Sequence, residues 1–165
     1  MELRYWVATF KALHDRARKG ELSSAERAQY LAQREELARA LVVAQRLVTL
    51  PDQTARQTLR VARALHVELE LLEGRQRVVT QHLSSRGFGA VVPKELVRNT
   101  AIGFSLRLPS TADPIVGRVK VLDVQARTGE ILISFAFNEL GAADLERLEL
   151  LLFDTILQQF EGMAF

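Results

Sequence analysis

The chain has 165 residues, of which 48% are hydrophobic and 25% are charged, and this composition excludes a fully disordered protein. It contains no cysteine, which excludes disulfides and thiolate metal sites and favours a reducing compartment. The formal net charge is only +2 and no apolar run is long enough to span a bilayer, so we expect a cytoplasmic protein without membrane insertion.

The first fifty residues predict two helices joined by a short loop. In the first helix, apolar side chains recur at intervals of three and four, and Lys19-Gly20 ends the pattern because glycine tolerates a left-handed conformation. Ser23 and Glu26 form a capping-box pattern at the start of a longer second helix. The apolar stripes of the two helices comprise Leu3, Trp6, Val7, Phe10, Leu13 and Ala17, then Tyr30, Leu31, Leu37, Leu41, Ala44, Leu47 and Val48.

These two stripes must be buried, and the sequence leaves two interpretations open. The helices could form an antiparallel hairpin that packs on itself and on the rest of the chain. Alternatively, part of the stripe pairs with a second copy of the chain, which would give a homo-oligomer through the N-terminal helices. The stripe is too short to indicate a coiled coil, which needs three or four heptads.

A change of hydrophobic period follows the helices. Pro51 and its polar neighbours predict a linker over residues 51–59, after which residues 60–72 alternate apolar and polar side chains. A turn at Glu73-Gly74 comes next. The remaining elements are predicted as strands over 75–83, 87–93, 101–109, 114–126 and 130–137 and a helix over 141–160.

Six short strands without long helices between them indicate an antiparallel barrel or sandwich. We therefore expect an α+β fold in three parts. Residues 1–50 form the helical hairpin, residues 51–59 form the linker, and residues 60–165 form a β domain that includes the C-terminal helix.

No residue pattern of a familiar enzyme class is present in the sequence. The histidines His14, His66 and His82 lie far apart and lack the spacing of a helical metal site. Paired carboxylates, a nucleophile elbow, a phosphate-binding loop and the dinucleotide-binding glycine pattern are also missing. We therefore expect no enzymatic activity, no metal and no cofactor, and we expect each histidine to be solvated or hydrogen-bonded.

Basic residues gather in the middle of the chain, where residues 56–107 carry nine Lys or Arg against four Glu. A local positive field of this kind suits a small anion better than duplex DNA, so we expect no DNA binding. Within this region, Arg56 and Arg60 lie four residues apart, just before the first strand. A guanidinium group can hold a phosphate with two hydrogen bonds and can stack on a base. The alternative is a solvated basic linker.

The segment TQHLSSRGFGAVV, residues 80–92, combines two serines and two glycines between apolar residues. Ser84 offers a hydroxyl and Gly87 an unobstructed backbone, at the end of one predicted strand and the start of the next. By itself the segment predicts either an ordinary polar turn or a place where the backbone comes close to a bound molecule.

The order of these features carries more information than each one alone. The chain has Arg-x-x-x-Arg, a strand, a turn, a returning strand and then x-x-Ser-x-x-Gly. This order, over about residues 54–160, resembles the PilZ domain, the bacterial receptor family for cyclic di-GMP, which is marked by RxxxR and [D/N]xSxxG. Arg56 and Arg60 match the first motif, and Ser84 and Gly87 match the second.

The resemblance implies a six-stranded antiparallel barrel that binds cyclic di-GMP. Arg56 and Arg60 would grip the phosphates and guanines of the ligand. Ser84 would supply a hydroxyl to a guanine edge, and Gly87 would leave clearance beside it. Arg63 and Arg86 could add positive charge as accessory residues, although no family motif assigns them that role.

His82 stands where the family has Asp or Asn. A neutral imidazole offers one acceptor nitrogen, whereas Asp can accept two hydrogen bonds at once. Losing such a contact weakens binding by about 1–3 kcal/mol, which is roughly ten- to a hundredfold. Two hypotheses follow. Either the chain is a non-enzymatic receptor that relays cyclic di-GMP binding to a protein partner, or it is a degenerate adaptor that acts through protein contacts without nucleotide.

Overall fold

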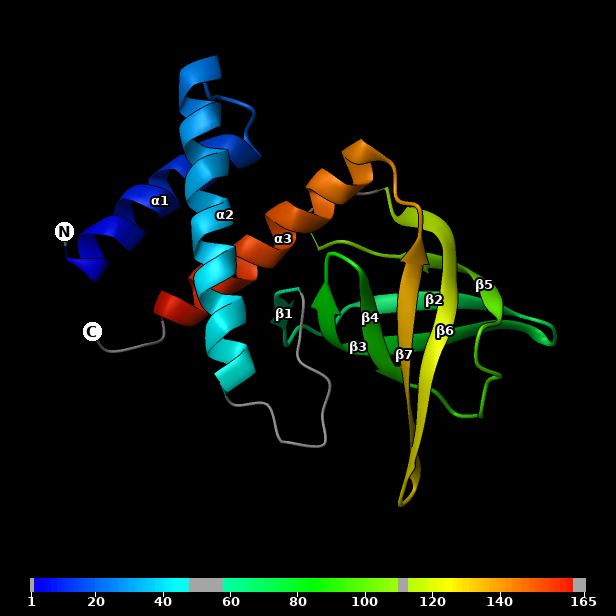
Figure 1. The fold of residues 1–165 in the computed structure, drawn as a ribbon. Coiled ribbons are helices and arrows are strands. Elements are labelled where there is room, and N and C mark those ends of the chain that lie inside the picture. The colour runs from blue at the N-terminus through cyan, green and yellow to red at the C-terminus, as the bar shows by residue number, and fades with distance from the viewer. Residues whose placement is uncertain (1, 48–57, 110–112, 162–165) are drawn as a thin grey trace. The chain divides into compact units, whose positions relative to one another are not determined.

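The computed structural model describes residues 2–47, 58–109 and 113–161, which form three helices and seven strands (Figure 1). These residues divide into two compact units. The helical unit contains α1 (Leu3–Arg18), α2 (Ser24–Leu47) and the part of α3 (Ala142–Glu161) from Glu149 onward. The barrel unit runs from Arg60 to Leu148 and contains all seven strands.

The boundaries of α1 and α2 follow the predicted signals. Gly20 has a φ of +70°, and the amides of Gly20 and Glu21 bond back to the carbonyls of Ala17 and Arg16, which is the Schellman arrangement. At the start of α2, the Glu26 amide donates to the Ser23 hydroxyl at 3.2 Å, and the Ser23 amide donates to the Glu26 carboxylate at 3.1 Å. The capping box is therefore confirmed.

Aromatic side chains form the core of the helical unit. Phe10 of α1 is fully buried, and its ring stacks on Tyr30 of α2 with 5.6 Å between centroids. The ring of Phe153 in α3 meets Phe10 edge-on at 6.2 Å. Part of the apolar stripes of α1 and α2 is therefore buried between these helices and the C-terminal part of α3, whereas Leu3 and Leu31 are exposed.

The seven strands make one antiparallel sheet in the order β1-β3-β2-β5-β6-β7-β4, and pairing between β3 and β4 closes it into a six-stranded barrel with β1 added alongside β3. Of the two folds that the sequence left open, an antiparallel barrel or a sandwich, the closed sheet is the barrel. The α+β prediction is therefore confirmed. The strands are β1 (Arg60–Val61), β2 (His66–Leu71), β3 (Gly74–Ser84), β4 (Gly87–Val91), β5 (Ala101–Leu106), β6 (Ile115–Arg127) and β7 (Glu130–Asn138).

The barrel interior is apolar and aromatic. Phe88 lies 5.0 Å from Phe135 and 6.2 Å from Phe104 between ring centroids, and all three are almost completely buried. Since side chains on a strand alternate between its two faces, the polar residues of the same strands point away from this core. Any binding chemistry of the strands is therefore presented on the outer face of the barrel.

Candidate functional site

The pairing of β1 with β3 brings the two sequence motifs together. Arg60 is the register partner of Ser84, and Val61 is the register partner of Leu83. Val61 and Leu83 are both buried in the barrel, so the alternation of strands puts Arg60 and Ser84 next to each other on the outer face. The second arginine of the first motif therefore lies beside the serine of the second. Arg56 lies outside the described residues.

A buried threonine fixes the segment between β1 and β2. The Thr80 hydroxyl accepts a hydrogen bond from the Leu65 amide at 2.9 Å and donates one to the Arg63 carbonyl at 2.6 Å. The Thr80 amide in turn donates to the Leu65 carbonyl at 2.9 Å. The predicted strand over residues 60–72 is therefore interrupted between Val61 and His66, where a side chain of β3 replaces part of the backbone ladder.

An irregularity in β3 sets the direction in which His82 points. The register with β4 shifts between Thr80 and His82, so the buried positions change from Val78 and Thr80 to Leu83. His82 consequently shares the outer face with Ser84. Its imidazole ring stands directly over its partner Gly89, where a Cβ atom would overlap the ring. Gly89 is thus explained by the space that His82 occupies.

The turn from β3 to β4 uses Ser84 and Gly87 structurally. The Arg86 amide donates to the Ser84 hydroxyl at 3.2 Å, and this hydroxyl makes a long contact of 3.4 Å with the Gly87 carbonyl. Gly87 is buried, and a Cβ atom there would overlap the Phe135 carbonyl of the neighbouring β7. Close approach of two backbones therefore requires glycine at this position, whether or not a ligand is bound.

These contacts define a rim of the barrel made by Arg60, His82 and Ser84. All three side chains are half-buried, and Arg86 is exposed in the adjacent turn. Arg63 is also half-buried and lines a separate hollow of the barrel unit with His66 and Arg107. Within residues 2–47, 58–109 and 113–161, no three His, Asp or Glu side chains are grouped so as to hold a metal ion.

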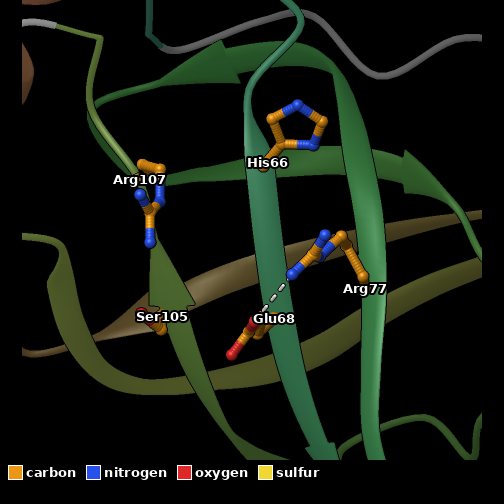
Figure 2. Close-up of a pocket in the computed structure, with 5 residues that line it drawn as sticks. All are labelled: His66, Glu68, Arg77, Ser105 and Arg107. Atoms are coloured by element: carbon orange, nitrogen blue, oxygen red, sulfur yellow. Dashed lines mark hydrogen bonds and ion pairs between the residues drawn. The ribbon is translucent and has the colours of Figure 1, made fainter.

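A second polar region, which the sequence analysis missed, lies on the outer face of β3, β2 and β5. Its hollow has a volume of about 310 Å³. Figure 2 shows the residues that line it, which are His66, Glu68, Arg77, Ser105 and Arg107. Register pairs place Glu68 between Arg77 of β3 and Ser105 of β5. The Arg107 amide donates to the His66 carbonyl, which continues the β2–β5 pairing by one step. Only this register, which the sequence does not reveal, brings these residues together.

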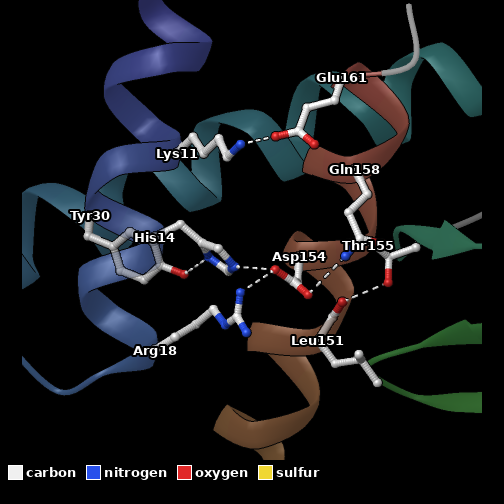
Figure 3. A network of polar contacts seen from close by, with 9 residues as sticks. All are labelled: Lys11, His14, Arg18, Tyr30, Leu151, Asp154, Thr155, Gln158 and Glu161. Carbon is white, nitrogen blue, oxygen red and sulfur yellow. Dashed lines mark hydrogen bonds and ion pairs between the residues drawn. The ribbon is translucent and has the colours of Figure 1, made fainter. Parts of the chain in front are cut away.

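The third histidine belongs to a buried network in the helical unit (Figure 3). His14 is fully buried, and its Nδ1 shares a hydrogen bond of 2.8 Å with the Tyr30 hydroxyl. Its Nε2 lies 3.6 Å from the Asp154 carboxylate, which also pairs with Arg18 at 2.9 Å. Burial lowers the pKa of His14 below its ordinary value, although the Asp154 charge opposes the shift. The prediction of a hydrogen-bonded histidine is confirmed here.

A family model described as the PilZ domain matches residues 54–154. This chain belongs to the PilZ domain family. The match begins before the arginine motif and ends within α3, so it includes both motifs and every strand of the barrel. The resemblance drawn from the sequence is therefore confirmed. No curated protein sequence matches the chain significantly.

Solved structures share the fold at low sequence identity. The inhibitor of motility MotI/DgrA of Bacillus subtilis has a TM-score of 0.56 and 19% identity, over 68% of this chain and 55% of its own. YcgR of Escherichia coli, in complex with c-di-GMP, has a TM-score of 0.57 and 16% identity, over 65% and 48%. The K. pneumonia MrkH–c-di-GMP complex has a TM-score of 0.60 and 18% identity, over 67% and 57%. This chain thus spans about half the length of these proteins, and the likeness establishes the fold. No helix of the described residues is long and apolar enough to cross a membrane.

Proposed function

We propose that this PilZ-domain chain is a non-enzymatic cytoplasmic receptor that binds cyclic di-GMP at the rim of Arg60, His82 and Ser84. Arg56 and Gly87 complete the two family motifs in the sequence and belong to the same proposed site. The observation that carries the proposal is the register pair Arg60–Ser84, which brings together motifs that are separated by a whole strand hairpin. Family membership supports the choice of ligand.

The proposed chemistry divides between charge and hydrogen bonding. The Arg60 guanidinium, joined by that of Arg56, offers a planar fork of donors to a phosphodiester or to the edge of guanine. The Ser84 hydroxyl can exchange its weak contact with the Gly87 carbonyl for a bond to the ligand. Arg86 and Arg63 add positive charge without touching the ligand in this proposal.

His82 sets the strength of this site. Its ring stands over Gly89, so the position that carries Asp or Asn in the family motif holds a bulkier group here. Because a neutral imidazole has a single acceptor nitrogen, it satisfies the paired N–H donors of guanine less well than a carboxylate does. We expect the chain to bind cyclic di-GMP more weakly than a family member with Asp at this position.

The output of the receptor is proposed to be a change in a protein partner. In the sequence, the arginine motif lies between α2 and β2, so a ligand bound by this motif acts on the part of the chain that joins the two compact units. A partner that recognises the helical unit could read this change. The alternative proposal is that the N-terminal helices pair with those of a second copy of the chain and form a homo-oligomer.

A second candidate function is favoured by the same histidine. If His82 removes too much of the guanine recognition, the chain acts as an adaptor that keeps the barrel and works through protein contacts alone. Both candidates leave the barrel folded, so only ligand binding separates them.

Isothermal titration calorimetry with cyclic di-GMP distinguishes the two. We expect saturable heat up to about 100 µM ligand and a rise in melting temperature, since a ligand that binds only the native state must stabilise it. The matched control is cyclic di-AMP, which has the same charge and lacks the guanine edge. A folded protein that gives neither heat nor stabilisation would overturn the receptor proposal in favour of the adaptor.

A further inference from the structure

The hollow on the outer face of β3, β2 and β5 contains polar groups that the fold itself does not use. Within the described residues, no partner pairs with the Arg107 guanidinium, the Ser105 hydroxyl or the imidazole of His66. Arg107 and His66 are exposed, and Ser105 is half-buried (Figure 2). All three can donate hydrogen bonds, so the hollow presents donors to whatever occupies it.

Among the described residues that line this hollow, the one carboxylate, Glu68, is already compensated. Glu68 lies 3.4 Å from the guanidinium of Arg77 and 3.7 Å from that of Arg75. With Glu68 offset by these two arginines, the positive charge of Arg107 is left without a counter-charge among the groups that line the hollow. The local field therefore favours a negatively charged occupant.

A neighbouring hollow of about 530 Å³ shares two lining residues with the first, His66 and Arg107. The second part also has Arg63 and an apolar wall of Leu65, Leu108 and Pro109. Together they form a groove with basic and donor groups along it and apolar surface at one end. Neither part is lined by a described Phe, Tyr or Trp, the side chains that offer the largest ring surface for stacking a nucleotide base.

The spacing of the donors matches an extended peptide. Arg107 and Ser105 lie two residues apart on one side of β5 and its continuation. His66 lies beside Arg107, and Arg77 lies across Glu68 from Ser105, which gives two rows of donors. Two residues of a strand span about 7 Å, which is also the distance between side chains on one face of an extended peptide. A peptide with acidic residues at alternate positions can place successive carboxylates against successive rows of the groove.

We propose that this groove is a docking site for an extended acidic segment of a protein partner. Carboxylates of the partner bind Arg107, His66 and Ser105, and an apolar residue next to them contacts Leu108 and Pro109. This inference does not depend on nucleotide binding, because the groove shares no side chain with the rim of Arg60, His82 and Ser84. Arg63 lines the groove but only adds charge to the proposed nucleotide site.

Fluorescence anisotropy with two labelled octapeptides tests the proposal at low ionic strength. One peptide alternates Glu and Ser, and the other alternates Gln and Ser. We expect the full chain to bind the Glu peptide in a salt-dependent manner and to ignore the Gln peptide. We expect Arg107→Gln to weaken binding about tenfold, and Ser105→Ala to weaken it less, because a charge-assisted hydrogen bond is stronger than a neutral one.

The matched control is Arg127→Gln, which removes an equal charge from an exposed arginine at the β6–β7 turn. If Arg127→Gln and Arg107→Gln weaken binding of the Glu peptide equally, the attraction is a general electrostatic one and the proposal is overturned. Failure of the wild-type chain to bind the Glu peptide would overturn it as well. If pyrophosphate binds the wild-type chain and the Glu peptide does not, the groove is a phosphate site and the peptide proposal is overturned. Circular dichroism of Arg107→Gln shows whether the variant is folded. Titration of the same variant with cyclic di-GMP shows whether nucleotide binding is retained, so that failure of the groove proposal is distinguished from failure of the receptor proposal.

Discussion

The two compact units use their polar side chains in opposite ways. In the helical unit, His14 is fully buried and held between Tyr30 and Asp154. In the barrel unit, His66 and His82 point outward beside arginines and serines. The comparison indicates that the polar network of the helical unit stabilises the fold, whereas the outer face of the barrel carries the side chains of the two proposed binding sites.

The substitution with the largest expected effect is Arg60→Ala, which tests whether the outer face of the barrel binds the ligand. We expect it to reduce cyclic di-GMP affinity at least about a hundredfold, because the variant loses a charge-assisted contact to the ligand at the proposed rim. We expect its thermal stability to change little, since the side chain is on the outer face. Calorimetry on Arg60→Ala and on the matched control Arg127→Ala measures both effects. Unchanged affinity in Arg60→Ala would remove the rim as the binding site.

Thr80 links stability to the position of the rim. Thr80→Val keeps the shape of the side chain and leaves the Leu65 amide and the Arg63 carbonyl without their partner, which should lower the free energy of unfolding by about 1–3 kcal/mol. Urea unfolding followed by circular dichroism measures the loss. The control is Thr155→Val in α3, where the hydroxyl bonds to the Leu151 carbonyl of the same helix. If the two substitutions have equal effects, the anchoring role of Thr80 is wrong.

His82→Asp restores the family motif and should strengthen cyclic di-GMP binding. We expect a gain of about tenfold, because a carboxylate accepts two hydrogen bonds from a guanine edge. The control is His82→Ala, which removes the ring without supplying an acceptor pair and should give no such gain. If neither substitution changes the affinity, His82 is not the cause of any weakness in binding.

The smallest effect concerns the pH dependence of the helical unit. The pKa of His14 is lowered by burial, so the unfolded chain binds its proton more readily than the folded chain does. Stability from this residue is complete above about pH 6.5 and is lost as the pH falls below that value. Glu26, whose pKa is lowered to about 2 mainly by its hydrogen bond with Arg16, begins to lose its contribution only below its ordinary pKa of 4.5.

Trp6 offers a selective probe for this prediction, because the only tryptophan of the chain stacks on Phe10 in the helical unit. Urea unfolding followed by its fluorescence should show that stability falls as the pH drops below about 6.5. In His14→Gln this step should be absent, since glutamine can bond to Tyr30 without titrating. If His14→Gln loses stability by the same amount over this pH range, a titrating group other than His14 is the cause.

The sequence alone predicts the elements of the barrel closely. The strand expected over 75–83 is observed as Gly74–Ser84, and the helix expected over 141–160 is observed as Ala142–Glu161. Local signals explain this success, because alternation, turn glycines and capping residues act within a few positions of each other. The predicted domain boundaries at residues 50 and 59 stay predictions, since most of the linker lies outside the described residues.

What the sequence does not predict depends on register and packing between strands. The break between β1 and β2 arises because the Thr80 hydroxyl bonds to the Leu65 amide and the Arg63 carbonyl, so the strand predicted over residues 60–72 is interrupted there. The groove at His66 and Arg107 depends on pairing between β2 and β5, which are about thirty-five residues apart. The roles of Gly87 and Gly89 likewise become clear only from their neighbours across the sheet.

The most direct test of the central claim is an NMR titration of the ¹⁵N-labelled chain with cyclic di-GMP. Binding at the rim should shift the amide signals of Arg60 and of residues 82–89 most strongly, while those of His66 and Arg107 change little. If the signals do not move, or if those of the groove shift and those of the rim do not, the pairing of Arg60 with Ser84 does not form a cyclic di-GMP site.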